Sequence, residues 1–193
     1  MTKFTPKIAQ TSTAGTAPHP VVVVGGANMD IVARTQRPLA PADSTPGQVA
    51  CSPGGVGRNV AENLARLGDP TQFVGLVGDD VFGQTLIQAT RMAGVDVSRC
   101  VVVPLARTAT YLSLHGPDGD MAMAVNDMAI MEHITPGFVL DHAPALAAAA
   151  CLVLDCNLPT AALACLFETA GQVPVFADGV SVAKCSRLLP WLN

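Results

Sequence analysis

The sequence predicts an α/β fold with a mainly parallel sheet, covered by helices on both faces, and a small β appendage. Short apolar runs rich in β-branched residues alternate with segments of helical periodicity, which is typical of βαβ units. Of the 193 residues, 50% are hydrophobic and only 13% are charged, so the chain can build a sizeable core. This length suits one domain, or one domain with a small addition.

The strands expected in the parallel sheet are short runs in which nearly every residue is apolar. Such runs are typical of strands that are buried on both faces. They comprise residues 21–26, 73–78, 100–104, 151–155 and 173–178.

Helices are expected after most of these strands. The first covers 56–67, with apolar residues at helical spacing and Gly68 as its C-terminal cap. Asp79 or Asp80 is expected to cap the second, because a carboxylate can accept from the free N–H groups of a first turn. Further helices are expected from Thr135 and Pro136 onward, over 159–170 and over 182–192.

The stretches 30–36 and 47–51 flank a Pro-rich loop and are less hydrophobic than the core strands. P-D-G-D at 117–120 predicts a hairpin over 109–125, with the methionines of 121–124 half-buried. These segments form the expected appendage within a folded body of residues 20–193. Residues 1–19 are rich in Thr, Ala and Pro and predict a disordered tail, with a targeting peptide as the alternative.

Charge and cysteine usage exclude several classes of protein. The net charge is −4 and no Lys/Arg run is present, which argues against a nucleic-acid partner. No apolar stretch is long enough to span a bilayer. The six cysteines show no C-x-x-C spacing, so we expect them to be reduced and buried in a cytoplasmic protein.

The motif G-G-A-N-M-D at 25–30 places two polar side chains where the first strand ends. In an extended backbone Asn28 and Asp30 point the same way. Ligands of open α/β sheets bind beyond the carboxyl ends of the strands, and both side chains can accept hydrogen bonds from hydroxyl groups. The pair therefore predicts a polyol site; the alternative is a turn after Gly-Gly.

The motif S-P-G-G-V-G-R-N at 52–59 places Gly54, Gly55 and Gly57 at the start of a helix. Missing Cβ atoms let a ligand approach the backbone, and Asn59 lies near the same helix end. Close packing of strand against helix is the alternative explanation. The glycine spacing fits neither a dinucleotide-binding loop nor a P-loop.

Taken together, G-x-N-x-D, P-G-G-V-G-R-N-V-A-E-N-L-A-R-L-G, F-V-G-L-V-G-D-D-x-F-G and A-G-V-D resemble the ribokinase-like (PfkB) family of carbohydrate and nucleoside kinases. The resemblance runs from residue 21 to the end of the chain. Within the family, A-V-N-D-M-A-I-M-E-H-I-T-P, D-C-N-L-P and D-G-V-S-V-A-K are most similar to the pseudouridine kinases.

The resemblance implies a doubly wound ribokinase-like sheet with a β lid from about 30–51 and 109–125. It implies ATP-dependent phosphorylation of a sugar or nucleoside hydroxyl, with Mg²⁺, giving pseudouridine 5′-phosphate from pseudouridine. A homodimer formed through the lid is possible on the family pattern. The substrate-binding residues that it implies are Asn28, Asp30, Gly54, Gly55, Asn59 and Asn157, of which the last could instead cap the helix after Pro159.

One part of the family pattern is missing. Its members carry an N-x-x-E segment and a G-A-G-D block in their C-terminal portion, and the G-A-G-D aspartate is the general base. Neither occurs suitably placed here. We therefore expect this chain to hold the substrate-binding half, with the general base beyond Asn193, no catalytic or metal-binding residue in the chain itself and no activity in isolation. A ribokinase, another nucleoside kinase or a non-catalytic sugar-binding or dimerising half-domain stays open, and Asp178 and Lys184 have no assigned role.

Overall fold

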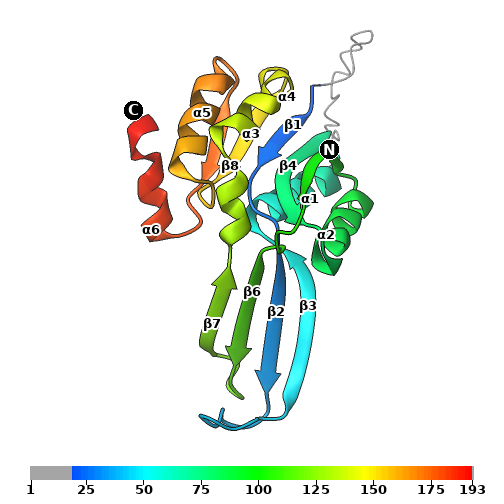
Figure 1. Cartoon of the computed structure of the whole chain (residues 1–193), viewed down its shortest axis with the longest axis vertical. Coiled ribbons are helices and arrows are strands. Elements are labelled where there is room, and N and C mark those ends of the chain that lie inside the picture. Colours follow the sequence, from blue (N-terminus) through cyan, green and yellow to red (C-terminus); the bar gives the residue numbers. More distant parts are fainter. Residues whose placement is uncertain (1–18, 193) are drawn as a thin grey trace, which may run out of the picture.

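A computed structural model describes residues 19–192, so nearly all of the expected N-terminal tail lies outside the described residues. The body contains a five-stranded sheet in the order β5-β4-β1-β8-β9, in which all neighbours are parallel (Figure 1). We call it the body sheet. Its strands are β1 (Val21–Val24), β4 (Thr71–Gly78), β5 (Asp96–Val103), β8 (Cys151–Asp155) and β9 (Val175–Asp178).

Helices cover both faces of the body sheet, as the alternation of runs predicts. On one face lie α1 (Val56–Leu67) and α2 (Val81–Met92), and on the other lie α3 (Pro136–Asp141), α4 (Ala143–Ala147) and α5 (Thr160–Ala170). The remaining helical segments are η1 (Ala129–His133), α6 (Val182–Cys185) and η2 (Ser186–Trp191). The last two divide the helix expected over 182–192.

The central strand β1 contributes to two separate hydrophobic cores. Val22 and Val24 pack with the α3, α4 and α5 side, whereas Val23 packs with the α1 and α2 side. This alternation follows from strand geometry, which points successive side chains to opposite faces. The apolar run at the start of the body therefore supplies both layers at once.

A second, four-stranded sheet extends away from the body in the order β3-β2-β6-β7 (Figure 1). We call it the small sheet. It consists of β2 (Asn28–Thr35), β3 (Gly47–Gly54), β6 (Thr110–His115) and β7 (Met121–Asp127). The two segments around the Pro-rich loop and the predicted hairpin, distant in sequence, thus form one sheet, because β2 pairs in parallel with β6.

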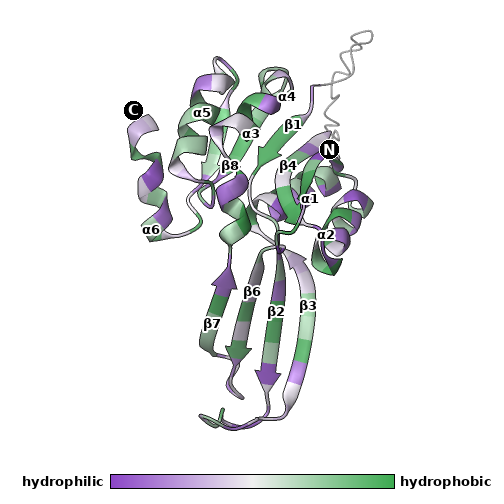
Figure 2. Ribbon diagram, viewed as in Figure 1, coloured by the Kyte–Doolittle hydropathy of each residue, from purple (hydrophilic) through white to green (hydrophobic). Residues whose placement is uncertain are grey.

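The two faces of the small sheet differ in polarity. Paired residues across the four strands form one row of Ser52, Asp30, Tyr111 and Asn126, and the next row, on the opposite face, of Cys51, Ile31, Leu112 and Val125. Figure 2 shows apolar residues along all four strands, and no helix among the drawn elements covers them.

The predicted half-burial of the methionines in 121–124 is wrong, because both side chains are exposed, even though the Tyr111 hydroxyl donates to Met121 Sδ at 3.4 Å. Met121 is 54% exposed and Met123 is 60% exposed. The six cysteines are free, but of the six only Cys156 is buried. Cys51 and Cys185 are exposed and the other three are half-buried, so the prediction of burial fails for most of them. Both errors arise because an apolar sequence pattern shows a strand or helix without showing what covers it.

The ends of the helices follow the predicted signals. Gly68 adopts the left-handed conformation that ends α1, with φ of 97°. Asp80 caps α2, since its side chain accepts from the Gly83 amide at 2.8 Å. Thr135 caps α3 directly before Pro136. In residues 19–192, no helix has both the length and the apolar character that crossing a membrane requires.

Candidate functional site

A pocket of about 310 Å³ lies where the carboxyl end of the body sheet meets the small sheet. Its walls come from β2, β6 and β7 of the small sheet, the start of α1, the segment after β8, and the region of α6. The lining residues are Asn28, Asp30, Gly55, Val56, Asn59, Tyr111, Asn126, Met128, Asn157, Val180 and Lys184. The structure thus brings together five of the six predicted substrate-binding residues; Gly54 lies behind Asp30 instead.

Asn28 and Asp30 stand side by side on one face of β2, as expected for an extended backbone. The Asn28 Nδ2 donates to Asp30 Oδ1 at 2.6 Å. Both residues belong to the start of β2, just after the chain leaves the body sheet, so the turn alternative does not describe them. This bond uses one of the two Asn28 N–H donors, so Asn28 keeps a second N–H and its carbonyl oxygen, and Asp30 keeps further acceptor capacity.

Asn59 faces the pocket from the first turns of α1 and is held from behind by Arg58. The Arg58 Nη1 donates to Asn59 Oδ1 at 3.0 Å, and Arg58 Nε donates to Thr90 Oγ1 at 3.1 Å. Arg58 is itself buried and also pairs with Glu62. With its oxygen engaged, Asn59 has its amide N–H groups left as donors.

Asn157 contacts Lys184 across the pocket wall. The Lys184 Nζ donates to Asn157 Oδ1 at 2.6 Å. The alternative that Asn157 caps a helix is wrong, because Pro159 occupies the cap position of α5 and no side chain caps it. Lys184, which had no role at the sequence level, is the one cation among the lining residues. Asp178 does not line the pocket; its carboxylate accepts from the Val180 amide at 2.7 Å.

The glycines of the helix start are explained first by close packing. Gly55 has φ of 99°, and a Cβ there would collide with the backbone of Gly26 and Ala27. A Cβ on Gly57 would lie 2.8 Å from the Cα of Gly25. A Cβ on Gly54 would overlap the Asp30 carboxylate. The missing Cβ atoms therefore let strand and helix meet, and at Gly54 they make room for a pocket side chain.

Sequence reasoning missed Asp155, the last residue of β8. It is 1% exposed and accepts three backbone N–H groups, from Gly26 at 2.7 Å, Gly57 at 2.9 Å and Asn157 at 2.8 Å. Burial raises the pKa of its carboxyl, because desolvation outweighs the three donors that favour the charged form. The signal was an acidic residue that ends the apolar run C-L-V-L-D. Tyr111 and Asn126, on the polar row of the small sheet, were also missed.

The carboxylate, histidine and cysteine side chains of residues 19–192 are the candidates for metal ligands. No group of three or more His, Cys, Asp or Glu side chains lies close enough to hold a metal ion in that part of the chain. The polar side chains of this pocket can bond hydroxyl groups, because four of them are amides and one is a carboxylate.

Residues 19–187 match the family model described as pfkB family carbohydrate kinase. The chain is 42% identical over 173 residues to a pseudouridine kinase of Escherichia coli (strain K12), covering 90% of this chain and 55% of that protein.

Two solved structures show the same fold. A carbohydrate kinase from Agrobacterium tumefaciens superposes with a TM-score of 0.80 at 31% identity, covering 88% of this chain and 56% of that chain. An Arabidopsis thaliana ribokinase complexed with ribose and ATP gives 0.77 at 25% identity, covering 84% and 54%. The chain thus spans about half the length of these proteins. It has their ribokinase-like fold and belongs to the pfkB family of carbohydrate kinases.

Proposed function

We propose that this protein transfers the γ-phosphate of ATP to the 5′-hydroxyl of pseudouridine, and that the present chain supplies the pocket for the nucleoside. The observation that carries the proposal is the convergence of Asn28, Asp30, Asn59 and Asn157 on one hollow beside the small sheet. The likeness to the E. coli pseudouridine kinase supports the choice of substrate.

The arrangement of donors and acceptors suits a ribose. Asn28 and Asp30 present oxygens from β2, which can accept from two neighbouring hydroxyl groups. From the opposite wall, the amide of Asn59 can donate to a hydroxyl oxygen. Val56 and Met128 supply apolar surface against which sugar or base carbons can pack.

In this proposal the small sheet acts as a lid, since its polar face forms one wall of the pocket. The backbone of Gly55 approaches the sugar at the helix start, and Gly54 acts through the space it leaves for Asp30.

This chain spans only 55% of the length of its E. coli relative. We therefore propose phosphate transfer for the whole protein and not for this chain alone. Transfer of this kind depends on positioning and on stabilisation of charge. The described residues account for positioning of the acceptor; we assign none of them to ATP or Mg²⁺. The protein is proposed to work in the cytoplasm.

A second candidate function is a sugar-binding or dimerising module without catalysis. The exposed apolar face of the small sheet favours it, since Val49 is 69% exposed and Val125 is 60% exposed. Two copies of the chain could cover these faces against each other. Contiguous exposed apolar surface commonly marks an interaction site.

The first experiment is calorimetric titration of the 193-residue chain with pseudouridine, uridine, adenosine and ribose. Tighter binding of pseudouridine than of the other three compounds supports the proposal. Equal binding of ribose would move the assignment to a ribokinase, and binding of none of the four would overturn it.

The second experiment is ATP-dependent phosphorylation of the same four compounds in the presence of Mg²⁺. Phosphorylated pseudouridine supports the kinase proposal for the chain itself. Binding without phosphate transfer is the result expected of a chain that supplies the nucleoside pocket alone, and the same assay on a longer protein that contains this chain then separates the two candidates: transfer by the longer protein supports the kinase proposal, and its absence favours the binding-module candidate.

A further inference from the structure

We infer that Asp155 is the positioning residue of this pocket: its buried carboxylate fixes the relative placement of the three segments that carry the candidate sugar ligands. The inference rests on the proposed function. Asp155 itself does not line the pocket, so its effect on a ligand must pass through the residues that do.

Each of the three donors to Asp155 lies within two residues of a candidate ligand. Gly26 precedes Asn28 by two positions, and Gly57 precedes Asn59 by two positions. Asn157 donates through its own backbone N–H at 2.8 Å. One carboxylate therefore ties together the end of β1, the first turn of α1 and the segment after β8.

The division of the three bonds between the two oxygens strengthens this link. Oδ2 accepts from both Gly26 at 2.7 Å and Gly57 at 2.9 Å, whereas Oδ1 accepts from Asn157. A neutral amide cannot accept on both sides, because one of its two terminal atoms is a donor. Substitution by asparagine therefore leaves at least one of the three N–H groups facing another donor.

The end of β1 and the start of α1 are packed closely around the Asp155 carboxylate. A Cβ on Gly57 would lie 3.0 Å from Asp155 Oδ2, and one on Gly25 would overlap that oxygen. The glycines at both positions thus allow the carboxylate to sit between strand and helix. The glycines of G-G-A-N-M-D and P-G-G-V-G therefore serve a buried acid as well as a ligand.

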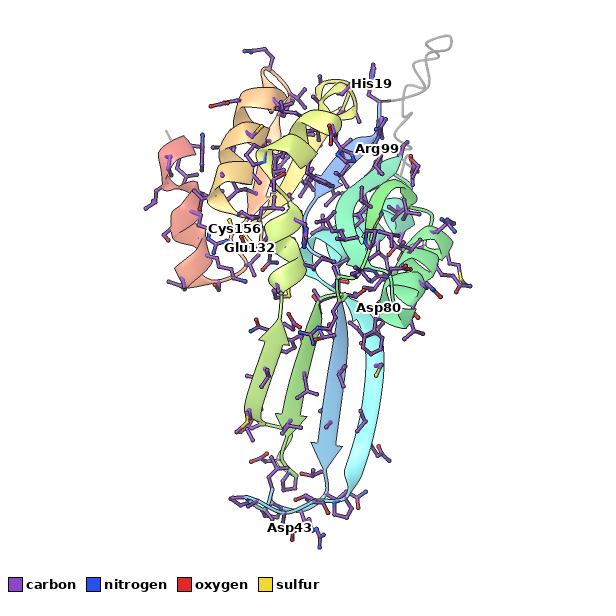
Figure 3. All side chains as sticks on the ribbon, viewed as in Figure 1. His19, Asp43, Asp80, Arg99, Glu132 and Cys156 are labelled. Atoms are coloured by element: carbon purple, nitrogen blue, oxygen red, sulfur yellow. The ribbon has the colours of Figure 1, made fainter. Side chains whose placement is uncertain are left out.

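Asp80 provides a matched control. It also accepts three hydrogen bonds, from the Gly83 amide at 2.8 Å and from the Thr108 amide and hydroxyl at 2.8 and 2.6 Å. Neither partner lines the pocket. Figure 3 shows Asp80 on the α2 side of the body, whereas Cys156, the neighbour of Asp155, lies toward α5 and α6.

The test compares Asp155→Asn with Asp80→Asn in the 193-residue chain, with pseudouridine as the probe. Both variants are expected to unfold at lower temperature, because each loses an acceptor for a backbone N–H. Circular dichroism identifies a temperature at which both remain folded. There, Asp155→Asn is expected to weaken pseudouridine binding about tenfold or more, while Asp80→Asn changes it less than about twofold.

A second variant covers the case in which Asp155→Asn does not fold. Gly57→Ala leaves the carboxylate intact but pushes α1 away from Asp155 and Gly25, and it is expected to weaken binding in the same direction.

Two outcomes separate the inference from the proposed function. If the folded Asp155→Asn variant loses no more affinity than Asp80→Asn, the carboxylate has a structural role alone and the inference is overturned. If the unmodified chain binds none of pseudouridine, uridine, adenosine and ribose, the proposed function fails, and the inference fails with it.

Discussion

The two sheets of this molecule are built on opposite plans. The body sheet is covered on both faces, and its central residues Val22, Val23 and Leu152 are each 0% exposed. The small sheet turns a polar face to the pocket and leaves an apolar face uncovered in the described part of the chain. Hydrophobic burial therefore stabilises the body, whereas strand pairing holds the small sheet and leaves its side chains available to a ligand or partner.

The junction between the sheets shows how the small sheet is held. Only three residues separate β1 from β2. Ala27 and Met29 pack into the core beneath α1 and α2, and the Met29 amide donates to Ala109 O at 2.8 Å. The first residues of β2 are thus anchored in the body, and Asn28 and Asp30 extend from a fixed point.

The largest expected effect lies in the body. Leu154→Ala removes a side chain that is 1% exposed, leaves a cavity, and is expected to cost about 2–5 kcal/mol of unfolding free energy. Val49→Ala, on the uncovered face of the small sheet, is expected to cost less than about 0.5 kcal/mol. Urea unfolding followed by circular dichroism measures both. Equal losses would show that the small sheet packs as a second core.

The next effect concerns binding rather than stability. Asp30→Asn removes a charged acceptor from the pocket and is expected to weaken pseudouridine binding by about 1.5–3 kcal/mol, or roughly 10- to 150-fold. Titration calorimetry measures the change. Asp141→Asn, an exposed substitution on α3, is the control and is expected to bind as the unmodified chain does. Retained affinity in Asp30→Asn would remove Asp30 from the site.

A smaller, pH-dependent effect is expected at Asp80. Burial works to raise the pKa of Asp80, but hydrogen bonds from Thr108 and Gly83 outweigh it, and the net pKa is lowered from 3.8. A lowered folded-state pKa means that this stabilisation is present above about pH 4 and is lost as the pH falls below it. Asp80→Asn is therefore expected to cost about 0.5–2 kcal/mol at pH 7, as loss of a helix cap does.

Thermal unfolding between pH 3 and pH 7 checks this sign. The gap between Asp80→Asn and the unmodified chain should narrow toward pH 3. A gap that stays constant would assign the whole cost to lost hydrogen-bond geometry rather than to charge.

The residues that sequence could and could not predict differ in how their contacts arise. Asn28 and Asp30 follow from strand alternation alone, and Asp80 follows from a helix-cap pattern. The role of Asp155 could not be predicted without knowing that the end of β8 lies beside Gly26 and the first turn of α1, which are both far away in the chain.

Lys184 reaches Asn157 through a long side chain from another element, so no spacing rule places it. The exposed methionines of β7 illustrate the same limit, because a strand pattern does not say what covers its outer face.

The smallest expected change in stability belongs to the uncovered face of the small sheet, which extends away from the body toward the tip that Asp43 marks in Figure 3. Met123→Thr combined with Val125→Thr replaces two side chains that are each 60% exposed, so the free energy of unfolding of the monomer should change by less than about 1 kcal/mol. If two copies pair through this face, as proposed, the double variant should nevertheless shift the dimer toward monomer in sedimentation velocity. Pseudouridine binding should persist, because both residues lie outside the pocket. An unchanged sedimentation coefficient in a folded variant would leave the apolar face without a role in pairing, and the contrast between the two sheets would then be one of packing alone.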